Sequence, residues 1–485
     1  MKNFLLSIGL LFVTTSVYTY AIETTNLLQK TLIHYTPQEQ NSRVAFAYTA
    51  SVSRFYHSPK PYDTYTNNSF GRFEIEGNVF IKHDSIFADN KYYSNDYFYD
   101  EQDLLSKSPS DSLFLPQTNS ALQEQIIHLS FYSPIPLLRF ALKHQDEVTV
   151  ESTKHLAKIE VGIEEYTILM FINRDKLLVD SLQIFYYDSY YGNIKNVLHY
   201  KHSAIETLYF PATVLHFKMN SKIIDTLQTS FVGYNIFEKS DPQRPKDFAY
   251  QSKKKTQTTL KDTILTPTMR ALQFREERIQ SYLLEFSNFL VILEAPLTSD
   301  IGEQIIQYAK RTYPNKPIKY VSYSHHHPHY TGGLRPFVHN GTTIVTKTEN
   351  KDYLESLFTN SHSLNPDSLE FSKKIPAFIT YDSTFTITDA IDSLQLLHLG
   401  IRSNHTYDYT LFYKTKEKLL LVGDLVWITN NSIVNKAGKG QKALYDFINE
   451  KAIPVKTIYQ AWPVMSPKYK TIIPFVELKA SAEMR

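Results

Sequence analysis

The sequence of 485 residues predicts an α+β chain of two domains, a mostly-β domain followed by one in which strands and helices alternate. Two observations predict this division. Up to about residue 237, short runs alternate polar and apolar residues, as strands with one buried face do. After the polar, proline-containing linker 238–262, an apolar strand, a helix and a second strand follow one another. The hydrophobic content of 42% is sufficient for two full-sized cores.

Charge and cysteine content limit the chemistry of the chain. The 51 Lys and Arg residues nearly balance the 49 Asp and Glu residues, and the net charge of +2 gives no support for a nucleic-acid or anionic-membrane partner. Because the chain has no cysteine, a bound metal must be held by histidine and carboxylate side chains. The partner that we expect is a small-molecule substrate or ligand of unknown identity, and the oligomeric state is not predicted.

The first residues have the pattern of a secretory signal peptide. Lys2 precedes an apolar run over residues 4–17, and the small residue Ala21 provides a cleavage site, so that residues 1–21 would be removed. An uncleaved anchor is the alternative. A lipoprotein anchor is excluded because no cysteine follows, and no later stretch reaches the ~20 apolar residues of a membrane-spanning helix. We therefore expect a periplasmic or secreted protein.

The predicted N-terminal domain, residues 22–237, is of unknown role. Its alternating runs predict antiparallel strands, and residues 133–145 predict a helix with proline in its first turn, which together favour a curved sheet around a helix. The many aromatic residues of this half could line a ligand site or fill the buried face of the sheet. The strand-like runs are residues 71–84, 156–173, 177–189 and 212–220.

The predicted C-terminal domain, residues 263–485, places a histidine-rich loop where α/β sheets place their sites. An apolar strand at 289–293, a helix at about 299–312 and a second strand at 318–323 precede the sequence SHHHPHYTGG. This loop therefore follows the carboxyl end of a strand, which is the usual position of catalytic and binding residues in such sheets.

The spacing within the loop separates its histidines. In an extended segment the side chains of His325 and His327 point to one side, while His326 points away. Two ligands hold a metal weakly, so we expect a third from His405 and a carboxylate from Asp424, which follows an apolar strand and a glycine. Three histidines with an open fourth position are typical of catalytic zinc, which lowers the pKa of a bound water molecule to about 7.

The region from about residue 265 to 465 resembles the metallo-β-lactamase fold family. The stretches that carry the resemblance are VILE, SHHHPHYTGG, NHTYDYTLFY and KLLLVGDLVW, in this order. The resemblance implies an αββα sandwich in the C-terminal domain. It also implies that His325, His327 and His405 are ligands of a first metal, and that Asp424 is the carboxylate that bridges two metals in the family.

The chain departs from the family at the ligands of the second metal. His329 and Tyr330 stand where the family has Asp-His, and Ala461 or Trp462 stands where its last histidine is expected. We therefore predict a degenerate second metal site, blocked by Trp462. His329 is a candidate general base or a solvent-facing residue, and Tyr330 is a candidate donor to an oxyanion or a filler of the lost ligand's space.

The sequence leaves the cofactor and the activity open between alternatives. The preferred reading is a metal-dependent hydrolase with one zinc ion and with Asp424, His329 and Tyr330 as candidate catalytic residues. A single iron held by two of the histidines and Asp424 is the second possibility that the family implies. The alternative from another class is a catalytically degenerate binding or scaffold protein without a metal.

Overall fold

The computed structural model divides the chain into two compact units. The first unit comprises Met1–Arg54, Tyr65–Tyr186 and Ile194–Lys254. The second comprises Phe55–Thr64, Tyr187–Asn193 and Lys255–Arg485, and so includes two short segments from the N-terminal half of the sequence. The structure describes residues 23–36, 42–55, 57–76, 79–88, 91–100, 104–107, 115–116, 119–205, 207–220, 223–238, 258–431 and 435–484.

The first unit is built on a large antiparallel sheet. Thirteen strands pair in the order β6-β5-β4-β3-β2-β1-β13-β12-β11-β10-β9-β8-β7. The strands are β1 (Ser42–Arg54), β2 (Tyr65–Glu76), β3 (Val79–Ala88), β4 (Lys91–Tyr99), β5 (Leu104–Lys107), β6 (Leu115–Pro116), β7 (Thr149–Ser152), β8 (Leu156–Ile163), β9 (Tyr166–Asn173), β10 (Leu178–Asp188), β11 (Gly192–Ile205), β12 (Leu208–Met219) and β13 (Ile223–Glu238). The mostly-β character predicted for this half is confirmed.

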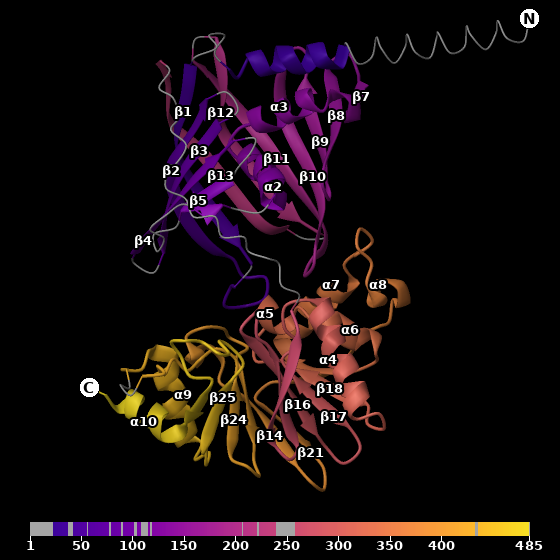
Figure 1. Cartoon of the computed structure of the whole chain (residues 1–485), viewed down its shortest axis with the longest axis vertical. Helices are drawn as coiled ribbons and strands as arrows, with labels where there is room; N and C mark the ends of the chain where they lie inside the picture. Colours follow the sequence, from indigo (N-terminus) through magenta and orange to yellow (C-terminus); the bar gives the residue numbers. More distant parts are fainter. Residues whose placement is uncertain are drawn as a thin grey trace, which may run out of the picture. The chain divides into compact units, whose positions relative to one another are not determined.

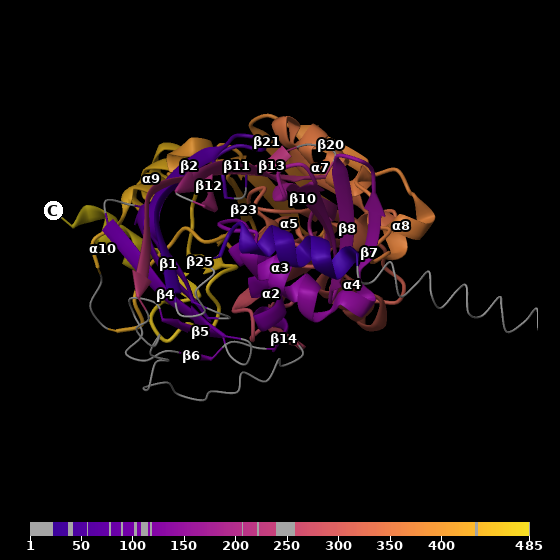
Figure 2. The same ribbon diagram turned by 90° about the horizontal axis from the view of Figure 1, so that it is seen from above.

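The sheet curves around helices, and much of its inner face is apolar. In β8 the residues Ala157, Ile159 and Val161 are buried while their neighbours alternate outward, as the sequence pattern predicted. Helices α2 (Asn119–Ser130) and α3 (Ile135–Lys143) lie on the concave side (Figures 1 and 2). Their apolar side chains join the same core as the inner face of the sheet. The predicted helix thus forms, with Pro134 directly before its first residue.

The second unit has two mixed sheets. One has the strand order β14 to β20 and the other β21 to β26, with parallel pairing from β17 to β20 and between β24 and β25. The strands are β14 (Leu260–Thr266), β15 (Met269–Phe274), β16 (Ile279–Glu285), β17 (Leu290–Leu293), β18 (Ile318–Ser322), β19 (Thr343–Lys347), β20 (Ala377–Tyr381), β21 (Thr384–Thr388), β22 (Ser393–His398), β23 (Thr410–Lys414), β24 (Leu419–Val422), β25 (Thr457–Gln460) and β26 (Ile472–Pro474).

Helices accompany both sheets of the second unit. Helix α9 (Lys439–Glu450) and helix α10 (Phe475–Glu483) pack their apolar residues, among them Leu444 and Leu478, against β24, β25 and β26. Helix α4 occupies Ser299–Thr312 between β17 and β18, as the sequence predicted, and lies beside α6 (Leu334–His339) next to the other sheet (Figure 1). The remaining helices are α5 (Pro328–Thr331), α7 (Lys351–Thr359) and α8 (Ser368–Ser372).

Two predictions fall on residues that the structure describes little or not at all. The predicted signal peptide, residues 1–21, lies outside the described residues, as does most of the predicted linker, 238–262. None of the helices in the described ranges combines the length and the hydropathy that crossing a bilayer requires.

Candidate metal centre

The histidine loop is held tightly at both ends by backbone contacts. At its start, the Ser324 amide donates to Glu294 Oε2 (3.0 Å), a carboxyl whose pKa burial raises to about 8. At its end, α5 begins at Pro328, a favoured residue at the first helical position. Gly332 then passes so close to residue 297 that a β-carbon would lie 2.0 Å from the Leu297 carbonyl oxygen. Only glycine fits there, which explains the first of the two glycines that end the loop.

His326, which we expected to point away from its neighbours, is bound to Asp408. Its amide donates to Asp408 Oδ2 (2.8 Å) and its Nδ1 lies 3.0 Å from Oδ1. Asn350 Nδ2 also donates to this carboxylate (2.7 Å). Burial raises the pKa of Asp408, but His326 and Asn350 outweigh burial and hold the pKa below its usual value. His326 therefore anchors the loop through its contacts with Asp408.

His325, His327 and His405 converge, as the sequence predicted. One ligand atom from each lies within 4.8 Å of the others, and the Nε2 atoms of His325 and His405 are 3.2 Å apart. His327 Nε2 lies 3.0 Å from the Ser58 carbonyl oxygen, which can only accept a hydrogen bond. The proton of His327 is thus on Nε2, and its buried Nδ1, with no partner among the described residues, carries a lone pair.

Local turns bring His405 and Asp424 to this group. Asn404 adopts a left-handed conformation (φ 55°), which asparagine tolerates, and the next amide donates to Ser403 Oγ (3.1 Å). Asp424 follows β24 and Gly423, where a β-carbon would lie 2.5 Å from Ser324 Oγ. Each of the two turns thus sets one side chain beside the loop.

Asp424 is an ionised acceptor beside two imidazoles. Its Oδ2 lies 3.6 Å from His329 Nε2 and 3.8 Å from His405 Nε2. Its amide donates to the Tyr409 hydroxyl (3.1 Å), which in turn donates to Oδ1 (3.4 Å). Burial raises the pKa of Asp424, but His329 and His405 outweigh burial and keep the pKa below its usual value. The side chains of His325, His329 and Asp424 form a second group of potential ligands.

The converging histidines are neutral, which is the form that ligates metals. Burial lowers the pKa of His325 well below its ordinary value, and the neighbouring histidines add to this shift. Burial also lowers the pKa of His327 and of His405. Neutral imidazoles with lone pairs directed at one another are a donor set that fits a zinc or iron ion.

His57 joins the cluster, and the sequence analysis missed it. It lies in segment 55–64 of the second unit, with its ring centroid 4.8 Å from that of His327 and 5.2 Å from that of His329. These three histidines form a third group of potential ligands. Burial, together with His329 and His405, lowers the pKa of His57 to about 4. A lone histidine in a loop between two strand-like runs has no metal-ligand spacing, so no sequence signal marked it.

Tyr330, and not Trp462, is the large residue against the histidines. Tyr330 is 0% exposed, its ring centroid is 4.7 Å from that of His325 and 4.4 Å from that of His329, and its hydroxyl has no partner among the described residues. Trp462 is 36% exposed and its ring packs on Trp427. Tyr330 is therefore the aromatic side chain packed against His325 and His329, whereas the prediction that Trp462 blocks a second metal stays a prediction.

A cavity of about 700 Å³ in the second unit reaches the cluster at His329. Three carboxylates, Asp188, Glu277 and Asp300, line it, and no lysine or arginine is among the described residues of its wall. The electrostatic potential in this cavity is therefore negative, which favours the entry of neutral or cationic molecules.

Comparison with known proteins identifies one family. Residues 275–461 match the model of the metallo-beta-lactamase superfamily. Similar solved structures include a metallo-beta-lactamase from Pontibacter korlensis (14% identity, 46% of this chain and 97% of that chain, TM-score 0.35). They also include the mono-zinc form of the metallo-beta-lactamase FIM-1 from Pseudomonas aeruginosa (14%, 46% and 93%, TM-score 0.33) and the flavodiiron protein from Giardia intestinalis (12%, 47% and 59%, TM-score 0.33). No curated protein matches the chain.

Proposed function

Because residues 275–461 belong to the metallo-beta-lactamase superfamily, we propose that the protein is a metal-dependent hydrolase with a single metal ion held by His325, His327 and His405. The observation that carries the proposal is His327, whose Nε2 is committed to the Ser58 carbonyl while its buried Nδ1 has no partner among the described residues. A buried polar atom normally has a partner, and a metal ion would supply one here.

Zinc is the preferred metal, with iron as the alternative. Three imidazole ligands and an open position are the arrangement in which zinc provides an activated water molecule at neutral pH. Asp424, ionised and next to His405 and His329, would accept a hydrogen bond from that water and orient it. His329, 3.6 Å from the Asp424 carboxylate, is the candidate general base.

Tyr330 and the acidic cavity complete the proposed site. The buried hydroxyl of Tyr330 has no partner among the described residues and is available as a donor to a developing oxyanion. The carboxylates Asp188, Glu277 and Asp300 along the approach favour a neutral or cationic substrate over an anionic one.

Metal content tests the proposal directly. We expect the full chain, purified from cells supplied with zinc and iron, to carry about one ion by elemental mass spectrometry, as a set of three histidine ligands predicts. The His325→Ala/His405→Ala double variant should lose at least nine-tenths of it, since it keeps one of three ligands. The matched control is His339→Ala, because the ring of His339 forms a hydrogen bond with the Ser372 hydroxyl on the surface. A folded wild-type chain without metal contradicts the proposal and favours the degenerate binding or scaffold protein.

His57→Ala identifies which set of histidines holds the ion. With His325, His327 and His405 as ligands, this variant keeps its metal. Loss of the metal in His57→Ala, with retention in His405→Ala, would assign the ion to His57, His327 and His329 instead.

We also propose that the protein is exported, to the periplasm or the medium. The support is the sequence pattern of Lys2, the apolar run and Ala21. Amino-terminal sequencing of the protein from the producing cells should begin at Ile22, and a chain that begins at Met1 in the cytoplasm would contradict export.

A further inference from the structure

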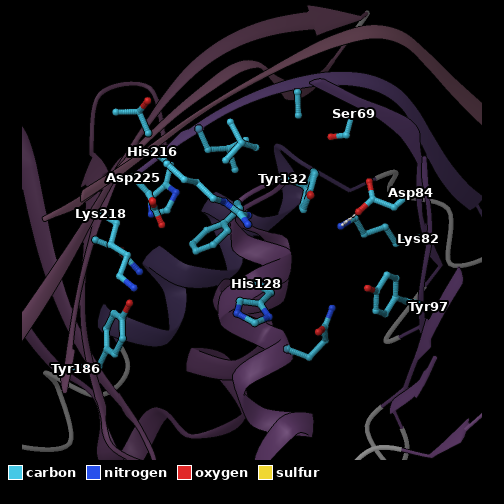
Figure 3. Close-up of a pocket in the computed structure, with 18 residues that line it drawn as sticks. Ser69, Lys82, Asp84, Tyr97, His128, Tyr132, Tyr186, His216, Lys218 and Asp225 are labelled. Atoms are coloured by element: carbon cyan, nitrogen blue, oxygen red, sulfur yellow. Dashed lines mark hydrogen bonds and ion pairs between the residues drawn. The ribbon is translucent and has the colours of Figure 1, made fainter. Parts of the chain in front are cut away.

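The first unit contains a cavity of about 380 Å³ on the concave side of its sheet. Residues from β1, β2, β3, β4, β10, β11, β12, β13 and α2 form its wall (Figure 3). Its volume is in the range of pockets that hold small organic molecules. All of its lining residues belong to the first unit, so the cavity is independent of the metal centre.

Charged side chains lie on two facing sides of the cavity. On one side, in β3, Lys82 Nζ is 2.8 Å from Asp84 Oδ2, and Tyr48 donates to Asp84 Oδ1. On the other side, Asp225 of β13 is the register partner of both Arg54 in β1 and Lys218 in β12. Figure 3 shows the pair Lys82 and Asp84 across the cavity from Lys218 and Asp225.

Two buried polar side chains in the wall lack partners among the described residues. They are Asn196, whose Oδ1 is unpaired and which is 5% exposed, and His216, whose Nε2 is unpaired and which is 7% exposed. The His216 ring is fixed by stacking on Phe131 (centroids 4.4 Å apart). Because buried polar atoms normally have partners, a polar occupant of the cavity is indicated.

The chemistry of the wall narrows the class of the occupant. The unpaired atoms of Asn196 and His216, on the neighbouring strands β11 and β12, disfavour an apolar ligand, which would leave them without partners. A lone metal ion is disfavoured, because every group of three potential ligands found among the described residues lies in the second unit. Aromatic rings in the wall provide apolar surface for the faces of a ring compound: Tyr97, Phe131, Tyr132 and Tyr186.

The charge of the wall indicates an acidic occupant. Its cationic side chains exceed its carboxylates by one, with Arg54, Lys82 and Lys218 against Asp84 and Asp225. A ring compound with hydroxyl groups on its rim would pair with polar atoms on several sides, and one carboxylate would balance the excess positive charge. We propose that this cavity binds an acidic monosaccharide, a ring that carries several hydroxyl groups and one carboxylate.

Isothermal titration of the full chain with D-glucuronate and with D-galacturonate tests the proposal. We expect saturable binding of at least one uronate, with D-glucose at least tenfold weaker because it lacks the carboxylate. Absence of saturable binding of both uronates would overturn the proposal and leave the cavity as a hydrated space. Binding of glucose as tight as that of the uronates would overturn the assignment of an acidic ligand.

Three variants connect the binding to this cavity. Asn196→Leu keeps the side-chain volume and removes the unpaired acceptor, so we expect binding to weaken tenfold or more while the melting temperature stays the same or rises. His216→Phe should also weaken binding and keep the stacking on Phe131. The matched control is His199→Phe. His199 lies on the exposed face of β11, the strand that pairs with β12, and this variant should bind as the wild type does. Unchanged binding in both cavity variants, or an equal loss in the control, would overturn the location.

Discussion

The metal centre of the second unit and the cavity of the first unit both contain buried imidazole nitrogens without partners among the described residues, but they differ in the space beside these atoms. His325, His327 and His405 bring one nitrogen each within 4.8 Å of the others. In the first unit, Asn196 and His216 instead face a space of about 380 Å³. A small set of converging nitrogen atoms fits an ion, whereas a cavity of this volume fits a molecule. The space beside the unpaired atoms therefore indicates the size of the missing partner.

The two regions also differ in how their histidines are held. At the metal centre, neighbouring polar groups fix the rings, as Asp408 fixes His326 and the Ser58 carbonyl fixes His327. In the cavity, His216 is fixed by the apolar face of Phe131. Hydrogen bonds define which nitrogen carries the proton, while ring stacking does not, so only the first arrangement selects a ligand atom in advance.

Removal of Asp408 should have the largest effect on stability. The Asp408→Ala variant leaves the buried donors of His326 and Asn350 without their acceptor. We expect the free energy of unfolding of the second unit to fall by about 3 to 5 kcal/mol. Urea titration followed by the fluorescence of the two tryptophans, Trp427 and Trp462, measures this change, because both lie in the second unit.

The control for this prediction is an exposed acidic residue of the same unit. Asp446 pairs with Lys442 one turn away on the surface of α9, and Asp446→Ala should change the free energy of unfolding by less than about 0.5 kcal/mol. Equal losses in the two variants would show that Asp408 does not anchor the loop.

The free energy of unfolding of the first unit should depend on pH, and His216 should contribute to this dependence. The expected effect is smaller than that of Asp408→Ala. Burial, with nearby Lys218 as a smaller cause, lowers the pKa of His216 to about 3 in the folded state, against an unfolded value of about 6.5. Below pH 6.5 the unfolded chain therefore binds a proton that the folded chain excludes, and the free energy of unfolding falls as the pH falls. At about 1.4 kcal/mol for each pH unit, lowering the pH from 6.5 to 5.0 should cost about 2 kcal/mol through this one histidine.

Two variants compared with the wild type isolate the contribution of His216 to this pH dependence. His216→Phe should lose about 2 kcal/mol less than the wild type over the same pH interval, measured by hydrogen exchange of β12 during urea titration. His199→Phe, on the exposed face of the neighbouring strand, should keep the wild-type pH dependence. An unchanged dependence in His216→Phe would show that His216 is protonated in the folded chain at pH 5.

Local patterns in the sequence predicted part of the fold. The helix at 299–312 and the strands on either side of it form where the apolar periodicity placed them. Alternation likewise predicted four runs of the first half that cover all or part of β2, β3, β8, β9, β10 and β12, since one apolar face per strand is a local property. The number and order of the strands in the large sheet could not be predicted, because pairing between β1 and β13 joins residues that lie far apart in the sequence.

Spacing and family resemblance placed His325, His327, His405 and Asp424 together, and the structure brings them together. They did not reveal His57, because its position depends on segment 55–64 leaving the first unit for the second. The packing of the Trp462 ring on Trp427 could not be predicted for a similar reason, because no pattern within either stretch of sequence encodes this contact.

Apart from the control variants, the smallest expected effect on stability is that of Tyr330→Phe. This variant distinguishes a residue that only packs against the metal centre from one that is a metal ligand. Burial raises the pKa of the Tyr330 phenol well above its ordinary value, so the phenol stays protonated and is a poor ligand. Since its hydroxyl has no partner among the described residues, we expect the free energy of unfolding to stay the same or rise by up to about 1 kcal/mol. Metal content should stay at the wild-type level by elemental mass spectrometry. A loss of metal in this variant would make Tyr330 a ligand and would remove the distinction between the converging histidines and the aromatic residue packed against them.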